Sequence, residues 1–236
     1  MQRRDFTKMA LAGAVGAVAE PAVAKAQASF NPNPSSHMTM ASQIDLNHCC
    51  GVILDVQGAF YSRLDGYRRP KVKTNTKNFV RLLGYFKVPL VVTLESPANL
   101  KGRLPREVRE HLSDQTATFE KYFFDLTKEK HIRDHLASLN KKQIIVAGSE
   151  TDVCVLQSCL GLLRLGYEVY MVEDLLFSTS ANVDSAIVRM KVAGATFITY
   201  KTLFYELLQA ERGGPHAENL AATYGAFPDD LPDSTV

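Results

Sequence analysis

Short, continuous runs of apolar residues recur along the chain, and stretches with the spacing of amphipathic helices separate them. The runs occupy residues 51–56, 89–94, 143–148, 168–172 and 196–200. Each has the length of a strand and is apolar on both faces, which is typical of a parallel sheet covered by helices on both sides. The sequence therefore predicts an α/β fold with three layers, α/β/α, around a mainly parallel, doubly wound sheet.

Helices are expected between these strands, where apolar residues recur every three or four positions. The expected helices cover residues 74–86, 107–112, 128–139, 152–165, 181–193 and 202–210. Gly166 and Gly194 follow two of them directly, as glycines that end helices do. The basic segment 68–73 contains Pro70 and is expected to be a solvated loop.

The first 28 residues have the composition of an export signal. Arg3 and Arg4 precede a weakly apolar run over residues 9–19, and small residues at 24–28 form cleavage sites. This pattern predicts a twin-arginine signal peptide over residues 1–28 and a periplasmic or secreted protein. If the pattern arose by chance, the protein would be cytoplasmic. The run is too short, and too interrupted by glycine, to span a bilayer.

The rest of the chain divides into three parts. Residues 29–48 are rich in Pro, Asn and Ser and are expected to be a linker or arm, residues 49–211 the folded domain, and residues 212–236 a tail. The formal charge of +2 comes from residues 1–28, because the remainder has 23 basic and 23 acidic residues. A near-neutral chain argues against nucleic-acid binding. The sequence has no glycine-rich loop for a nucleotide cofactor.

Polar and reactive residues follow three of the expected strands. Asp55 ends the first, Glu95 follows the second, and the segment 148–154 joins the third strand to its helix and ends at Cys154. Ligands of open α/β sheets bind in the crevice beyond the carboxyl ends of the strands. We therefore expect these residues to lie at the site.

Three segments resemble the isochorismatase-like cysteine hydrolases. They read Leu-Asp-Val-Gln at 54–57 with Phe60, Phe-Glu-Lys-Tyr-Phe at 119–123, and Ala-Gly-Ser-Glu-Thr-Asp-Val-Cys-Val at 147–155. The family includes nicotinamidases, N-carbamoyl amidohydrolases and ureide or biuret hydrolases. The resemblance covers about residues 50–210 and implies that Asp55, Lys121 and Cys154 are catalytic.

Elementary chemistry agrees with this assignment. A nucleophilic thiol needs activation. The helix start and the Lys121 ammonium are expected to lower the pKa of Cys154, and Asp55 can carry the proton. Backbone N–H groups of Glu150 and Cys154 are expected to form the oxyanion hole. The resemblance implies a cis peptide between Ser149 and Glu150.

Further residues complete the expected site and its surroundings. Substrate-pocket positions are assigned to Gln57, Phe60, Glu95 and Phe177. Asp152 is expected to be a helix N-cap and Cys159 a core residue, with His131 and His135 on a solvated helix face. The nicotinamidases of this family carry histidines just after the second strand, whereas this chain has none there. We therefore expect neither a metal nor any cofactor.

The predicted activity is cysteine-dependent hydrolysis of a non-peptide C–N bond in a small molecule, through a thioester. The resemblance also implies a homo-oligomer. Two alternatives remain open at this point. One is an ether hydrolase of the isochorismatase type, which would lack the nucleophilic cysteine, and the other is a catalytically silent binding or assembly module.

Overall fold

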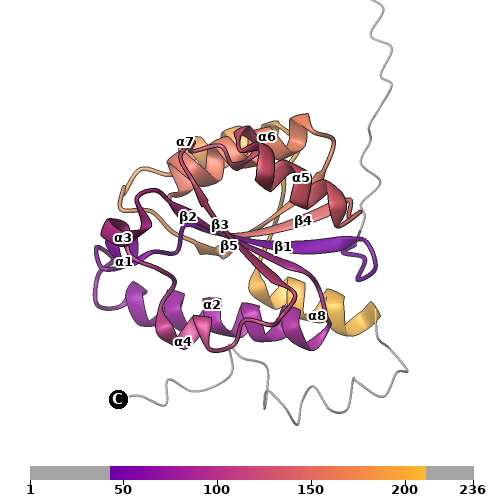
Figure 1. Cartoon of the computed structure of the whole chain (residues 1–236), viewed down its shortest axis with the longest axis horizontal. Coiled ribbons are helices and arrows are strands. Elements are labelled where there is room, and N and C mark those ends of the chain that lie inside the picture. Colours follow the sequence, from indigo (N-terminus) through magenta and orange to yellow (C-terminus); the bar gives the residue numbers. More distant parts are fainter. Residues whose placement is uncertain (1–42, 211–236) are drawn as a thin grey trace, which may run out of the picture. The chain divides into compact units, whose positions relative to one another are not determined.

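The structure is a computed structural model that describes residues 43–210. The predicted signal peptide, the arm up to residue 42 and the tail lie outside the described residues. Six strands form one sheet in the order β3-β2-β1-β4-β5-β6, and every neighbouring pair is parallel (Figure 1). The strands are β1 (Cys49–Leu54), β2 (Leu90–Glu95), β3 (Thr116–Lys121), β4 (Gln143–Gly148), β5 (Glu168–Leu176) and β6 (Thr196–Ile198).

Helices cover both faces of this sheet, as the doubly wound prediction requires (Figure 1). One face carries α2 (Arg68–Tyr85), α4 (Arg106–Arg109) and α8 (Tyr200–Ala210). The other carries α5 (Lys130–Ser138), α6 (Leu156–Arg164) and α7 (Asp184–Val192). The shorter helical turns are α1 (Gly58–Tyr61), α3 (Ala98–Lys101), a 3₁₀ turn η1 (Leu126–Lys128) and a π-helical turn η2 (Thr151–Val155). No helix among residues 43–210 is long and apolar enough to cross a membrane.

The order of the strands creates a switch point between β1 and β4. From β1 the chain winds outward through β2 to β3 and then returns to β4, which pairs with β1 on its other side. The helices that follow β1 and β4 therefore leave toward opposite faces of the sheet. Such a divergence opens a crevice at the carboxyl ends of the two strands. Asp55 and Ser149 are the first residues after these strands.

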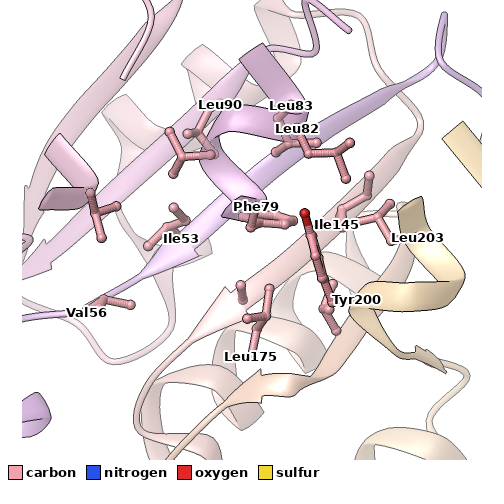
Figure 2. Packing of buried hydrophobic residues seen from close by; sticks show 14 of the residues in the cluster. Ile53, Val56, Phe79, Leu82, Leu83, Leu90, Ile145, Leu175, Tyr200 and Leu203 are labelled. Carbon is pink, nitrogen blue, oxygen red and sulfur yellow. The ribbon is translucent and has the colours of Figure 1, made fainter. Parts of the chain in front are cut away.

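A separate apolar core fills each space between the sheet and a helix layer. Beneath α2 and α8, Phe79 and Tyr200 are fully buried against Ile53 and Ile145 of the sheet (Figure 2). The opposite core joins α5, α6 and α7 to residues that alternate with these along the strands. Because both faces are buried, the strands are continuous apolar runs, which explains why the sequence pattern predicts them.

Two elements differ from the sequence prediction. Strand β3 is absent from it because this edge strand is only partly buried and Phe119 is its one large apolar residue. The basic segment 68–73 is wrongly predicted as a loop, since it forms the first turns of α2. Its charged residues, none of which is buried, give no apolar periodicity, and Pro70 lies in the first turn, where proline is tolerated.

The folded domain begins before residue 49. Ile44 is buried in the core beneath α8, and its backbone N–H donates to Glu206 of that helix at 3.0 Å. The backbone N–H of Asp45 donates to the side chain of Gln143 at 2.7 Å. The end of the expected arm is therefore part of the domain.

All four cysteines are free and buried. Cys49 and Cys50 are neighbours in β1 but belong to the cores on opposite faces of the sheet. Cys159 is a core residue of α6, as predicted, and burial raises its pKa to about 12. Burial keeps these thiols protonated and away from solvent, which limits their oxidation.

The close approach of α6 to η1 depends on Gly161. A Cβ at this position would lie 2.3 Å from Asp125 Oδ1 and 2.4 Å from Thr127 Oγ1. Asp125 is buried, accepts the Thr127 N–H at 2.9 Å and pairs with Arg164 at 3.0 Å, so its side chain is held in place. The segment directly after Lys121 is thus fastened to the helix that follows Cys154.

We expect Gly161→Ala to lower the free energy of unfolding by about 1–3 kcal/mol, the usual cost of overpacking. The matched control is Gly84→Ala in α2, where an added Cβ meets nothing within 4 Å. That change should be neutral or stabilise by up to about 1 kcal/mol, because alanine favours the helix. Urea denaturation of both variants measures the difference, and equal midpoints would contradict the packing argument.

Candidate active site

Asp55, Lys121 and Cys154 come together at the carboxyl edge of the sheet. Lys121 ends β3 and reaches past β2, so that its ammonium Nζ lies 2.7 Å from Asp55 Oδ2. The ligand atoms of Asp55, Glu95 and Cys154 all lie within 4.8 Å of one another. The Asp55 and Lys121 side chains are wholly inaccessible to solvent, and Cys154 is 1% exposed. The structure thus gathers a thiol, an ammonium and two carboxylates into one buried cluster.

Hydrogen bonds to the side chain and to the backbone carbonyl fix Asp55. Its φ of 49° turns the chain sharply after β1. Thr93 Oγ1 donates to Oδ1 at 2.8 Å, and Ser149 Oγ donates to the Asp55 carbonyl at 2.8 Å. Among the described residues, Oδ2 has no hydrogen-bond donor beyond its ion pair with Lys121. Oδ2 therefore keeps a lone pair free for a proton.

The buried pair of Asp55 and Lys121 has a defined electrostatic state. Burial raises the pKa of Asp55, although Lys121, Thr93 and Cys154 oppose the shift. Burial also works against the ammonium of Lys121, but the Asp55 carboxylate outweighs it, with help from Cys154 and Glu95, and the pKa of Lys121 is raised. Lys121 therefore stays protonated, and Asp55 holds a proton more readily than an exposed aspartate does.

The expected lowering of the Cys154 pKa is wrong in this structure. Burial raises the pKa of the thiol, and the negative charges of Asp55 and Glu95 raise it further, while Lys121 opposes them. The thiol donates to Glu95 Oε2 at 3.4 Å. Cys154 is therefore a neutral thiol at rest and has to lose its proton as it attacks.

The backbone before Cys154 is held close to β1. Gly148 has a φ of 132°, and a Cβ there would lie 2.0 Å from the Leu54 carbonyl oxygen. The peptide between Ser149 and Glu150 is cis. The backbone N–H groups of Val153 and Val155 both donate to the Glu150 carbonyl, at 3.1 and 3.0 Å. Cys154 lies between them in η2, so the turn that carries the thiol is closed onto Glu150.

The acidic side chains of this loop point toward the chain after β5. Glu150 Oε2 accepts from Ser178 Oγ and from Thr179 N and Oγ1, each at 2.8 Å. Asp152 accepts from Ser178 Oγ at 2.6 Å. The prediction that Asp152 caps the helix is wrong, because it lies inside η2 and Glu150 occupies the N-cap position. Both carboxylates thus fasten the loop that carries Cys154.

The four predicted pocket residues occupy different positions. Glu95 lies beside the thiol, and its side chain is 12% exposed. Phe60 is partly buried and packs on the core beneath α2. Phe177 is buried and, with Thr151 and Ser178, lines a cavity of about 180 Å³ that Cys154 does not line.

Gln57 is fully buried and supports Glu95. Its Oε1 accepts the Glu95 N–H at 2.7 Å. Its Nε2 donates to the carbonyls of Glu95 at 3.2 Å and Gly102 at 2.8 Å. Both ends of the amide are therefore engaged and hold Glu95 in position, while direct contact of Gln57 with a substrate stays a prediction.

Sequence reasoning missed Thr93 and Lys101. Thr93 stands beside Leu54 in the register of β1 and β2, which brings its hydroxyl to Asp55. Lys101, in α3, forms an ion pair with Glu95 Oε1. A polar residue inside an apolar strand is a signal that could have found Thr93. Lys101 has no such signal, because its position depends on the loop between β2 and α3.

The donor atoms at the site fit a metal poorly. Asp55, Glu95 and Cys154 are close enough to share an ion, but a lysine ammonium neutralises each carboxylate. A bound cation would therefore face two ammonium groups. His131 and His135 lie on α5, where both rings pack against Phe119, at centroid distances of 5.5 and 5.1 Å.

Comparison with known proteins identifies the family. Residues 49–202 match the family described as Isochorismatase domain. The chain belongs to the isochorismatase-like hydrolase family. A relative, the secreted isochorismatase effector Isc1 of Phytophthora sojae, is 30% identical over 175 residues, which are 72% of this chain and 80% of the relative.

Solved structures share the isochorismatase-like fold. The MAR1 ribonuclease of Caenorhabditis elegans has a TM-score of 0.69 at 24% identity, with 77% of this chain and 91% of that chain covered. YcaC of Escherichia coli, described as an octameric hydrolase of unknown specificity, has a TM-score of 0.65 at 23% identity, with 77% and 96% covered. The fold and the recognition of the family from the three sequence segments are thereby confirmed.

Proposed function

We propose that this protein is a cysteine-dependent hydrolase that cleaves a non-peptide C–N bond of a small molecule through a thioester. One observation carries the proposal. The Cys154 thiol lies in a buried cluster with Asp55, whose Oδ2 can accept a proton, and Lys121, whose ammonium compensates the charge. This combination supplies a nucleophile, a proton carrier and a fixed positive charge.

Acylation begins from the neutral thiol. As Cys154 Sγ bonds to the substrate carbonyl carbon, its proton passes to Asp55 Oδ2. Lys121 stays an ammonium and stabilises the negative charge that develops around the sulfur. The oxyanion accepts from the backbone N–H groups of Glu150 and Cys154 at the helix start.

The same carboxyl group then serves the leaving group. Protonated Asp55 gives its proton to the substrate nitrogen, the C–N bond breaks, and ammonia or an amine departs. In the second half of the reaction Asp55 takes a proton from water, which attacks the thioester and restores the thiol. The raised pKa of Asp55 suits both steps, because the group has to hold a proton between them.

The test is ammonia release from a panel of small amides, carbamoyl compounds and ureides, with and without exhaustive chelation. We expect at least one panel member to be hydrolysed, at a rate that chelation leaves unchanged. Hydrolysis of the isochorismate ether bond with no ammonia from any panel member would replace the proposal with an ether hydrolase. Loss of activity on chelation and recovery with zinc would overturn the metal-free mechanism.

We also propose that the protein is exported and forms a homo-oligomer. Export is supported by the sequence pattern of residues 1–28 and by a relative that is named as secreted. Assembly is supported by the octamer described for YcaC and by three consecutive exposed aromatic residues after the edge strand β3. These are Tyr122, Phe123 and Phe124, which are 80%, 52% and 46% exposed. Sedimentation of the mature protein tests the assembly.

A further inference from the structure

A second carboxylate at the reacting sulfur has no part in the proton transfers described above. Glu95 Oε2 accepts the Cys154 thiol at 3.4 Å, and Oε1 is held by Lys101. The side chain of Gln57 accepts the backbone N–H of Glu95 at 2.7 Å and donates to its backbone carbonyl at 3.2 Å. The Glu95 carboxylate is therefore fixed, and it has a small exposed surface where Asp55 and Lys121 have none.

The reaction removes the hydrogen-bond donor of this carboxylate. When the thiol proton moves to Asp55 and sulfur bonds to carbon, Glu95 Oε2 loses the S–H group that it accepted. A carboxylate oxygen left without a donor in a buried site is costly. A donor on the bound substrate can take the place of the thiol.

We propose, on the basis of the function above, that Glu95 selects substrates with an N–H on the retained side of the reacting carbonyl, that is, urea-type compounds. The leaving nitrogen has to face Asp55, which protonates it, so Glu95 faces the part of the substrate that stays on sulfur. In a urea-type substrate that part carries an N–H, which donates to Oε2. In a simple carboxamide it carries a CH₂, which leaves the carboxylate unpaired.

The chemical balance of this reaction is complete. Sulfur bonds to the carbonyl carbon of R–NH–CO–NH₂, the thiol proton passes through Asp55 to the departing nitrogen, and ammonia leaves. The thiocarbamate that remains, R–NH–CO–S, keeps its N–H toward Glu95. Water then displaces the sulfur and releases a carbamate, which decomposes to an amine and carbon dioxide.

The experiment compares N-ethylurea with butyramide, which differ by the exchange of one NH for CH₂. The kcat/KM for N-ethylurea is divided by the kcat/KM for butyramide, and this ratio is measured for the wild type and for Glu95→Leu and Glu95→Gln. We expect Glu95→Leu to lower the ratio by roughly 10- to 100-fold, as the loss of a charged hydrogen bond does. Glu95→Gln keeps an acceptor without the charge and should lie between. The control is Glu110→Gln. Glu110 is an exposed carboxylate directly after α4, and its replacement should leave the ratio unchanged.

The outcomes separate this inference from the function on which it rests. An equal loss of kcat/KM for both substrates in Glu95→Leu would overturn the selective role of Glu95. Hydrolysis of carboxamides by the wild type, without hydrolysis of any urea, would overturn it as well. If the wild type releases ammonia from no amide, carbamoyl compound or ureide, the proposed function itself fails, and this inference falls with it.

Discussion

Replacing Cys154 with alanine is expected to lower kcat by roughly 10⁴-fold or more, the range found when a covalent nucleophile is removed. The expectation rests on the position of the thiol, which shares one buried cluster with Asp55 and Glu95. No other cysteine of the chain belongs to that cluster, because Cys49, Cys50 and Cys159 lie in the apolar cores. Steady-state ammonia release measures the loss.

The matched control for this prediction is Cys159→Ala. Cys159 is also a buried thiol, it lies in the helix that follows Cys154, and its pKa is also raised by burial. This variant should lose stability through a small cavity but keep a kcat within a few-fold of the wild type. If Cys154→Ala were as active as Cys159→Ala, the thioester mechanism would be wrong.

The sequence predicts most of the sheet because burial on both faces leaves a clear signal. The strand at 143–148 is predicted to the residue, since its side chains are buried in both cores. The edge strand β3 is missed for the opposite reason, because it is covered on fewer sides. The strand order adds what no local pattern contains, namely that β1 and β4 are neighbours and open the crevice between them.

The residues of the candidate site also differ in how far the sequence predicts them. Asp55 and Glu95 are recognised because they end apolar strands, where ligands of α/β sheets bind. Lys121 is recognised only by resemblance, because nothing in its local sequence indicates a lysine that is wholly buried. The pKa of Cys154 is predicted in the wrong direction, since the prediction weighs the helix start and Lys121. Burial and the negative charges of Asp55 and Glu95 depend on tertiary structure, and together they outweigh Lys121 and raise the pKa of the thiol.

The second large effect is expected at Asp55. Asp55→Asn keeps the shape of the side chain and removes the group that carries the proton. We expect kcat to fall by roughly 10²–10⁴-fold while substrate binding survives, as is usual when a general acid–base group is lost. Rapid-quench and steady-state measurements of ammonia release separate kcat from KM. A kcat close to that of the wild type would show that another group carries the proton.

Stability and catalysis can be separated at this position because Asp55 forms a buried ion pair. Asp55→Asn leaves the Lys121 ammonium buried without its counterion, and breaking such a pair costs about 3–5 kcal/mol. In the double variant Asp55→Asn, Lys121→Met, both charges are gone, and replacement of a buried pair by uncharged groups is often neutral. We therefore expect the double variant to recover most of the lost stability and none of the activity. Activity that returned together with stability would mean that Asp55 acts only through the fold. A stable and inactive double variant would show that activity is lost because the charged pair is gone and not because the protein unfolds.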